Sequence, residues 1–190
     1  KKIFIKNKIL TPKFIKYSYR NNINKHKFIK YLQKAIGFPL VVKPINEGSS
    51  VNVFICNKHN FKKNLKKLNE YGEILIEKYI PGREIQVAIL EDKVLGAIEL
   101  KPTRKFYDYE AKYNPKARTK HIIPVEISKH KHQEVAKIAL KAHKILNCRG
   151  VTRSDFRYYK NSFYLLETNT QPGMTSLSLV PEIAKFNNIT

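Results

Sequence analysis

Apolar residues recur along this chain with two different periods, and these periods predict where helices and strands lie. A spacing of three and four residues predicts amphipathic helices, whereas alternation or a short apolar run predicts strands. The helical spacing covers residues 26–36, 61–71, 130–147 and 178–187. The strand patterns cover residues 13–17, 40–44, 74–80, 84–91 and 94–100. A helix–strand half precedes Pro81-Gly82 and antiparallel strands follow it, so a domain boundary is expected near this break.

The most informative stretch closes the last predicted strand. Glu167 and Asn169 are two residues apart, so they would project from the same face of a strand. Arg153 and Asp155 have the same spacing on the preceding run, and a hairpin through a turn at residues 159–162 would bring the two pairs together. Oxygen donors side by side suit Mg²⁺, and an arginine beside them is typical of phosphoryl transfer. Each pair taken singly is more often a solvated strand end than part of a metal site.

A second candidate lies where the predicted strand 40–44 meets a small polar loop. Lys43 is near the end of this strand, and residues 45–50 contribute one glycine and two serines. Backbone N–H groups in such a loop can bind phosphate. The Walker loop and the Gly-x-Gly-x-x-Gly fingerprint, the two commonest nucleotide motifs, are absent from the sequence. A lysine at a strand end is often simply exposed, so this segment alone does not identify a nucleotide site.

Residues 102–122 form a long irregular segment that is rich in aromatic residues. A loop of this length in a compact protein is often functional, typically as a lid over a site. The aromatic side chains could equally pack the segment down as a static surface loop. Both interpretations stay open from the residues alone.

Histidine and cysteine supply no metal-binding motif. The spacing of His130, His132 and His143 lacks the His-x-x-x-His pair of a metal-binding helix, so we expect all three on a solvated face. Cys56 and Cys148 are isolated, and we expect them to be reduced and buried, as in a cytoplasmic protein.

Composition and charge narrow the class of protein. With 42% hydrophobic and 27% charged residues, this chain of 190 residues is expected to be globular. No apolar run is long enough to span a membrane, and residues 1–10 lack the apolar core of a signal peptide. The net charge of +22 would attract polyanions, but lysines are spread over the whole chain. The joint excess of Lys, Ile, Asn and Tyr is what an A+T-rich genome produces, so nucleic-acid binding is the disfavoured class.

Several stretches match one family in order and in spacing. From Leu40 onward the sequence resembles the D-alanine–D-alanine ligases of the ATP-grasp superfamily. The match rests on residues 42–44 with 47–50, residues 77–79 with 82–84, residues 106–113, Arg153 with Asp155, and residues 167–176. Residues 106–113 and 172–176 are highly specific to this family, whereas a strand lysine alone is not.

The resemblance implies an α+β protein with the ATP-grasp fold, in which two subdomains with antiparallel sheets clasp ATP. The expected subdomains are residues 1–83 and 84–190, with a lid loop at about 102–122. The implied reaction joins two D-alanines through an acyl phosphate, consumes ATP, and makes a peptidoglycan precursor. The implied cofactors are ATP and two Mg²⁺ or Mn²⁺ ions.

The resemblance also implies a role for individual residues. For the nucleotide it implies Lys43, Glu77, Lys78, Ile80, Glu84 and Lys112. For the metal ions it implies Asp155, Glu167 and Asn169. It assigns the oxyanion to Arg153 and the Gly173 N–H, the lid latch to Ser49 and Tyr113, and the carboxylate of the second D-alanine to Ser178 and Leu179.

The chain departs from the family pattern at two positions. Asn52 stands where glycine is usual, and Ser154 stands where an apolar residue usually separates the arginine from the aspartate. The family also has an N-terminal substrate domain and a last helix. Both are expected to lie outside this chain, which would make it a fragment or a remnant of a cytoplasmic enzyme that forms homodimers at full length.

Three alternatives remain open from the sequence. The chain could act as another ATP-grasp carboxylate–amine ligase on different substrates, or it could be an inactive fragment. A basic nucleic-acid-binding module is an alternative from a different class, and it predicts steep salt dependence of binding. Glu167 separates these alternatives, because a charge-driven module would tolerate its loss whereas a ligase would not.

Overall fold

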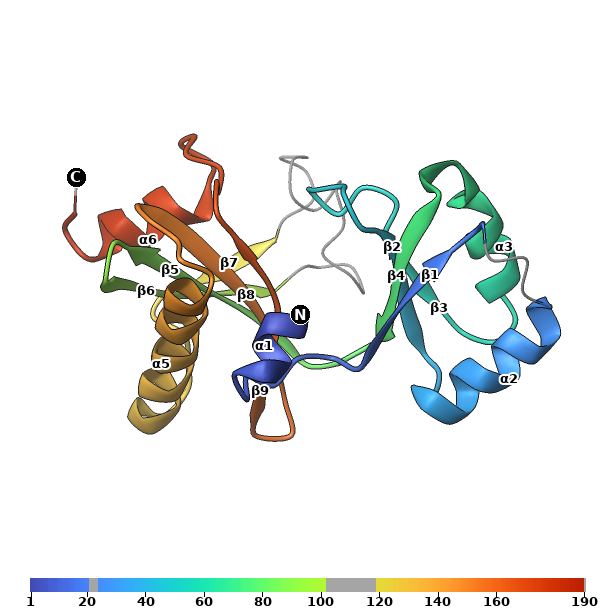
Figure 1. Cartoon of the computed structure of the whole chain (residues 1–190). Coiled ribbons are helices and arrows are strands. Elements are labelled where there is room, and N and C mark those ends of the chain that lie inside the picture. Colours follow the sequence, from blue (N-terminus) through green and yellow to red (C-terminus); the bar gives the residue numbers. More distant parts are fainter. Residues whose placement is uncertain (21–23, 102–118, 190) are drawn as a thin grey trace. The chain divides into compact units, whose positions relative to one another are not determined.

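A computed structural model describes residues 1–20, 24–101 and 119–189, and its backbone divides into two compact units (Figure 1). Within these ranges, residues 12–79 form one unit, which we call the four-stranded unit. Residues 1–11, 80–101 and 119–189 form the other, which we call the five-stranded unit. Each unit has its own antiparallel sheet and its own hydrophobic core.

The four-stranded unit orders its strands β1-β4-β2-β3, and every neighbouring pair is antiparallel. The strands are β1 (Phe14–Ser18), β2 (Leu40–Pro44), β3 (Phe54–Cys56) and β4 (Glu73–Lys78). The helices are α2 (Lys25–Ala35) and α3 (Phe61–Lys67), followed by a 3-10 turn, η1 (Asn69–Tyr71). Helix α2 starts after Asn24, whose side-chain oxygen accepts hydrogen bonds from the backbone N–H groups of His26 and Lys27.

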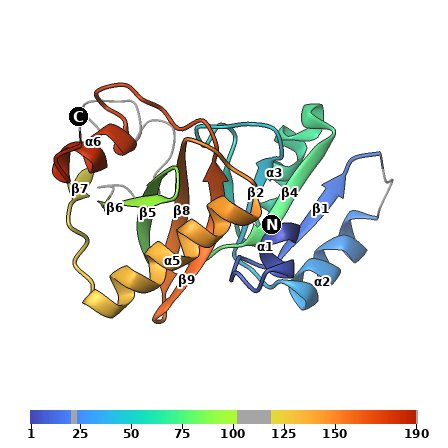
Figure 2. The same ribbon diagram turned by 60° about the vertical axis from the view of Figure 1, so that its left-hand side comes forward.

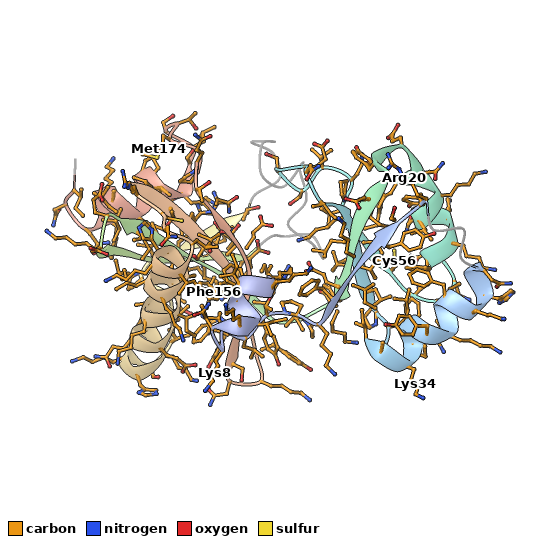
Figure 3. All side chains as sticks on the ribbon, in the orientation of Figure 1. Lys8, Arg20, Lys34, Cys56, Phe156 and Met174 are labelled. Carbon is orange, nitrogen blue, oxygen red and sulfur yellow. The ribbon has the colours of Figure 1, made fainter. Side chains whose placement is uncertain are left out.

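Alternation along these strands separates a core face from a second face. Helices α2 and α3 both contribute side chains to the core, so they cover the same face of the sheet (Figure 1). The buried residues of this core are Tyr17, Phe28, Leu32, Leu40, Val42, Cys56, Phe61, Leu65, Leu68, Ile74 and Ile76. Figure 3 labels Cys56 among these side chains. The strand positions between the core residues, Lys43 on β2 and Glu77 on β4, project from the face without helices.

The five-stranded unit orders its strands β7-β6-β5-β8-β9, again with every neighbouring pair antiparallel. The strands are β5 (Arg83–Leu90), β6 (Lys93–Lys101), β7 (Lys120–Ile122), β8 (Val151–Tyr159) and β9 (Ser162–Asn169). The helices are α1 (Lys2–Lys6), α5 (Lys129–Ile145) and α6 (Leu179–Phe186). None of the helices in the described part of the chain combines the length and the apolar character that crossing a membrane requires.

Helices α5 and α6 lie on different faces of this sheet. Helix α5 packs on the face that carries Ile85, Val87 and Phe156, as Figure 2 shows for the helix and Figure 3 for Phe156. Helix α6 contacts β6 at Gly96, where an added Cβ atom would lie 3.1 Å from Cγ2 of Ile183. Gly96 pairs with Ala88 of β5, which points to the face opposite to that of Ile85 and Val87. Helix α6 therefore covers that opposite face of the sheet at β6. The rest of that opposite face is where the candidate residues lie.

The predicted helices and strands are confirmed to within a few residues at their ends. Three short elements in the described ranges are additional to the prediction, α1 with five residues and β3 and β7 with three each. Such lengths cover too few positions for a period of 3.6 or 2 to emerge from the sequence. The predicted turn at residues 159–162 joins β8 to β9, with Lys160 and Asn161 at φ values of 46° and 61°.

The predicted irregular segment 102–122 is too long at its C-terminal end. Residues 120–122 form β7, which pairs with residues 99–101 of β6. The edge of β6 has backbone N–H and C=O groups that need partners, and a strand of three residues is too short to show alternation in the sequence. Residues 102–118 lie outside the described residues, and so do Lys112 and Tyr113 with most of the predicted lid.

The structure divides the chain differently from the expected subdomains 1–83 and 84–190. Residues 1–11 belong to the five-stranded unit, because Phe4 and Ile9 are buried in its core and the backbone N–H of Leu165 donates to the Leu10 carbonyl. The second change of unit falls between Tyr79 and Ile80. The contacts that assign residues 1–11 join positions far apart in the sequence, and local patterns do not register them.

The expectation of a solvated His143 is wrong. His143 is 3% exposed, and its Nδ1 lies 2.8 Å from Oγ1 of Thr152 on β8. His132 is half-buried, and its Nε2 lies 2.7 Å from the Val125 carbonyl oxygen, whereas His130 is exposed as expected. The helical face of α5 that packs on the sheet is therefore wider than its apolar residues alone suggest, and a histidine with a hydroxyl partner completes it.

Candidate active site

The β8–β9 hairpin brings the two predicted pairs together. In its register, Asp155 lies opposite Glu167 and Arg153 lies opposite Asn169. Residues directly opposite each other in an antiparallel pair share a face, so these four side chains project from the same face. This is the face of the sheet that does not pack on α5, because Phe156, the residue after Asp155 on β8, points to the opposite face and belongs to the core under α5. The predicted juxtaposition of the two pairs is confirmed.

Asp155 is held in place by two neighbours. The residue is 6% exposed, and the Arg153 guanidinium donates to both carboxylate oxygens, with Nε–Oδ1 at 2.8 Å and Nη2–Oδ2 at 3.0 Å. Asn169 adds a third donor, with Nδ2 at 3.2 Å from Oδ2. Charge-assisted bonds of this forked kind fix the orientation of a carboxylate. The Asp155 carboxylate is therefore preorganised, while Glu167 beside it is exposed.

The polar face continues onto β5. Gln86 lies opposite Asp155, and Glu84 lies opposite Arg157. The Arg157 guanidinium binds Glu84, with Nη2–Oε2 at 3.0 Å, and its Nη1 donates to the Gly82 carbonyl at 3.1 Å. The side chains of Glu84 and Arg157 are each 12% exposed, so this ion pair is largely withdrawn from water. Three neighbouring strands thus present a continuous row of carboxylate, amide and guanidinium groups.

This row has the chemistry of a site for a hard divalent cation. Asp155 and Glu167 supply carboxylate oxygens, and Asn169 supplies an amide beside them. In the described ranges, no group of three or more His, Cys, Asp or Glu side chains could hold a metal ion on its own. A pair of carboxylates completed by amide oxygens and water suits Mg²⁺ or Mn²⁺, which retain water ligands, better than it suits Zn²⁺. The residues therefore fit a hydrated magnesium or manganese ion.

The loop that follows β9 presents its polar groups at the start of α6. The Ser178 hydroxyl accepts a hydrogen bond from the Thr175 N–H at 3.0 Å and lies 2.9 Å from Oγ1 of Thr175. A Cβ atom added at Gly173 would lie 2.8 Å from the Ser178 hydroxyl, so this hydroxyl would have to turn away from Thr175 to make room for it. Leu179 is buried as the first residue of α6, whereas Met174 is exposed in the loop (Figure 3). Of the two residues predicted for the second substrate, Ser178 thus adjoins Gly173, and Leu179 follows it at the start of α6.

The four-stranded unit holds a second charged pair. Nζ of Lys43 on β2 lies 3.0 Å from Oε1 of Glu77 on β4, with side-chain exposures of 17% and 4%. Both residues project from the face of the sheet without helices. The lysine compensates the negative charge of the buried Glu77 carboxylate and is itself partly exposed. Two residues that were predicted separately for the nucleotide, Lys43 and Glu77, are therefore brought together within this unit.

Lys78 is engaged on both its main chain and its side chain. Its N–H donates to the Lys13 carbonyl at 2.8 Å, and its Nζ donates to the carbonyls of Gly37 and Phe38 at 3.1 and 3.0 Å. Burial lowers the pKa of the Lys78 ammonium. The side chain thus anchors the segment before β2. Ile80 is half-buried and belongs to the five-stranded unit, so the structure assigns these two predicted nucleotide contacts to different units.

Both departures from the family pattern have a structural explanation. Asn52 adopts φ of 54°, and asparagine tolerates this left-handed region better than other residues except glycine. Its Nδ2 also donates to the Tyr71 hydroxyl at 2.6 Å. Ser154 is fully buried, and its hydroxyl lies 2.9 Å from Oγ1 of Thr168 directly across the hairpin. Ser49, in the same loop as Asn52, is exposed and has φ of 52°.

Three residues of the site escaped the sequence interpretation. Gln86 follows Glu84 by two positions and Arg157 follows Asp155 by two, so the period of a strand would have placed both on the polar face. That signal was available in the sequence. Thr175 had no such signal, because its contact with Ser178 depends on the path of an irregular loop.

Comparison with known proteins gives a consistent set of relatives. A family model described as "D-ala D-ala ligase C-terminus" matches residues 4–190. Over 190 residues the chain is 65% identical to the D-alanine–D-alanine ligase of Pelagibacter ubique, covering 100% of this chain and 62% of that protein. Over 158 residues it is 44% identical to the D-alanine–D-alanine ligase of Paramagnetospirillum magneticum, covering 80% and 52% of the two chains.

Solved structures resemble the fold over almost the whole chain. The D-alanine–D-alanine ligase of Bacillus anthracis matches with a TM-score of 0.82 and 35% identity, covering 98% of this chain and 60% of that one. A structure of the Bacillus anthracis ligase complexed with ATP matches with a TM-score of 0.79 and 30% identity, covering 98% and 58%. The chain therefore spans roughly half to three-fifths of the proteins it matches. The mixed α and antiparallel β architecture is that of the ATP-grasp ligases, as the sequence predicted.

Proposed function

This chain belongs to the D-alanine–D-alanine ligase family, and on that premise we propose that it provides the ATP-binding part of an enzyme that joins two D-alanines. The carboxylate of the first D-alanine takes the γ-phosphoryl group of ATP, which yields ADP and an acyl phosphate. The amine of the second D-alanine then displaces phosphate to form the dipeptide used in peptidoglycan precursors. The observation that carries the proposal is the pairing of Asp155 with Glu167, with Arg153 alongside.

The proposed nucleotide contacts come from both units. They are Lys43 and Lys112 to the phosphates, Glu77 with the backbones of Lys78 and Ile80 to the adenine, and Glu84 to the ribose. The ion pairs Lys43–Glu77 and Glu84–Arg157 support this assignment, because each fixes a carboxylate that can accept from a nucleotide N–H or O–H group. The relative solved with ATP, at 30% identity, supports ATP as the nucleotide.

Asp155, Glu167 and Asn169 are the proposed ligands of two Mg²⁺ or Mn²⁺ ions. The bound ions would neutralise the charge on the phosphate oxygens and so favour attack on the γ-phosphorus. The contribution of this chain is to hold its oxygen ligands ready before the nucleotide arrives. Arg153 and Asn169 do this for Asp155 by donating three hydrogen bonds to its carboxylate.

The residues proposed for amide formation include Arg153 on β8, residues in the loop after β9 and at the start of α6, and Ser49 in the loop after β2. Arg153 and the Gly173 N–H would stabilise the oxyanion of the tetrahedral intermediate. The Ser178 hydroxyl and the Leu179 N–H, at the start of α6, would bind the carboxylate of the second D-alanine. Ser49 and Tyr113 are the proposed latch between the loops. The proposal includes a cytoplasmic location, where ATP and D-alanine are available, and a homodimer at full length.

Calorimetry of the purified chain with ADP tests the site directly. We expect binding that requires Mg²⁺, that Glu167→Ala weakens by at least tenfold, and that the exposed-residue control Glu126→Ala leaves unchanged. Turnover is then tested by fusing the chain to the part of the Pelagibacter ubique ligase that it does not match, and by measuring ADP release that depends on D-alanine.

Three other results would each contradict a specific part of the proposal. Release of ADP with a different amino acid but not with D-alanine would assign the site to another carboxylate–amine ligase. Mg²⁺-dependent binding without turnover of the fusion would indicate an inactive remnant. Binding of RNA or DNA that falls steeply with salt and ignores both Mg²⁺ and Glu167→Ala would assign binding to the net charge of +22.

A further inference from the structure

Gln86 on β5 is a buried polar residue whose side-chain carbonyl is unsatisfied. The residue is 1% exposed, and among the residues that the structure describes Oε1 has no hydrogen-bond partner. More than about 90% of buried polar atoms in proteins have a partner, and an unsatisfied one destabilises the fold. A methionine or leucine would fill the same position without that cost. An amide at this position therefore calls for a functional explanation.

The sheet register places Gln86 in line with the proposed cation residues. Reading across the sheet, Ile98, Gln86, Asp155 and Glu167 occupy consecutive strands as direct partners. Direct partners share a face, and the neighbours of Gln86 along β5 belong to the core under α5. The Gln86 amide thus projects from the same face as the two carboxylates and lies next to Asp155.

The neighbouring donors on β8 serve other acceptors. Arg153 donates through Nε and Nη2 to Asp155, and Arg157 donates to Glu84 and to the Gly82 carbonyl. A carboxylate such as Asp155 is an acceptor, so it cannot satisfy the Gln86 carbonyl. No described residue is thus seen to donate to the Gln86 carbonyl, and a bound ligand, or water that a ligand holds in place, can supply that donor.

We infer that the Gln86 carbonyl accepts hydrogen bonds from the water shell of the divalent cation that binds at Asp155 and Glu167. This inference rests on the proposed function, since it needs the cation site. Mg²⁺ releases its water reluctantly and uses few protein ligands, so much of its binding energy depends on groups that orient its water. Removal of such an outer partner typically lowers metal affinity by about 10- to 100-fold. Gln86 is accordingly a positioning residue for the cation.

The test compares three variants of the chain by calorimetry with ADP, in Mg²⁺ and in a chelator. Gln86→Met keeps the length of the side chain but removes the carbonyl, and we expect it to weaken Mg²⁺-dependent ADP binding by about tenfold or more. Gln86→Glu keeps an oxygen acceptor, and we expect affinity within about threefold of wild type. Gln133→Met makes the same change at an exposed position of α5 and should match wild type. ADP binding in chelator should be equal in all four proteins.

Stability without ligand separates this role from a structural one. If the carbonyl serves only the bound cation, Gln86→Met should melt at the same temperature as wild type or higher, because a buried unsatisfied group has been removed. A structural role predicts a lower melting temperature and equal loss of binding with and without Mg²⁺. A second measurement uses NMR of the wild-type chain labelled with ¹³C at the side-chain carbonyls of its four glutamines. The Gln86 signal, identified by its loss in Gln86→Glu, should shift with Mg²⁺ and ADP but not with ADP in chelator.

The outcomes of the inference and of the proposed function are distinguishable. Wild-type binding that needs Mg²⁺ and Glu167, together with Gln86→Met binding within twofold of wild type and no shift of the Gln86 signal, would overturn the inference alone. Wild-type binding that ignores Mg²⁺ and Glu167 would overturn the proposed function and the inference with it. Selective loss of Mg²⁺-dependent affinity in a Gln86→Met protein that remains folded would establish the role of Gln86.

Discussion

The Arg83 guanidinium binds the Glu99 carboxylate through two hydrogen bonds, from Nε to Oε1 at 2.8 Å and from Nη2 to Oε2 at 2.5 Å. Glu99 is 1% exposed on β6, and Nη1 of Arg83 also donates to the Glu126 carbonyl. The bond to Glu99 raises the pKa of Arg83 further above its ordinary value. We therefore expect Arg83→Met to leave a buried unpaired carboxylate and to lower the free energy of unfolding by about 3 kcal/mol, measured by urea denaturation.

The partner variants decide whether the pair itself or the unpaired charge matters. The double variant, Arg83→Met with Glu99→Met, should have a free energy of unfolding within about 1 kcal/mol of wild type, because no buried charge is then left unpaired. Lys144→Met removes an exposed pair with Asp92 in the same unit, and it should change stability by less than about 0.5 kcal/mol. A double variant no more stable than Arg83→Met would show that the arginine acts by packing rather than by compensating charge.

Gly82 is the position where the fold depends most on the absence of a side chain. It has φ of 105°, and an added Cβ would collide with the Tyr158 carbonyl oxygen. Gly82→Ala should therefore lower the free energy of unfolding by about 3 kcal/mol or more. Gly150, in the same unit, has φ of 66° but open space around an added Cβ, so Gly150→Ala should cost only about 1–2 kcal/mol. Equal losses in urea denaturation would show that backbone conformation, not the collision, dominates at Gly82.

Arg153 should contribute more to turnover than to nucleotide binding. Lysine keeps the positive charge but cannot offer two N–H groups in a fixed fork to Asp155 and the oxyanion. For Arg153→Lys in the fusion ligase we expect kcat/KM to fall by about 10²- to 10³-fold, with Mg²⁺·ADP affinity within about threefold. Arg149→Lys, an exposed control in the same unit, should retain full activity. A parallel loss of ADP affinity in Arg153→Lys would mean that Arg153 acts through the orientation of Asp155.

Local sequence patterns were sufficient to predict most of the helices and strands and part of the candidate site. The period of two along β8 and β9, with a turn of residues that tolerate positive φ, correctly predicted that Asp155 and Glu167 would be neighbours. The same period applied to β5 would have found Gln86. Secondary structure and the juxtaposition of these residues are thus encoded within one hairpin, residues 151–169.

The remainder depends on contacts between distant segments. Residues 1–11 join the five-stranded unit because Phe4 and Ile9 enter its core, and nothing near them in the sequence indicates that destination. His143 was misjudged for the same reason, since its partner Thr152 lies on a strand that the helical pattern does not include. The contact of Thr175 with Ser178 depends on loop geometry, which propensities do not define. The predicted roles at Lys112 and Tyr113 remain predictions.

The two cysteines provide an independent reporter for each unit. Cys56 is fully buried in the four-stranded unit and Cys148 is half-buried in the five-stranded unit, and burial raises the pKa of both thiols. A raised pKa means less thiolate at pH 8 than in a free cysteine, so both should react slowly with an aromatic disulfide, Cys56 more slowly than Cys148. Both rates should rise as the pH increases beyond 9, because the thiolate fraction grows. The variants Cys148→Ser and Cys56→Ser each leave one thiol and so show which cysteine gives the slow and which the fast phase of the reaction. A native Cys56 that reacts as fast as in urea would contradict its burial.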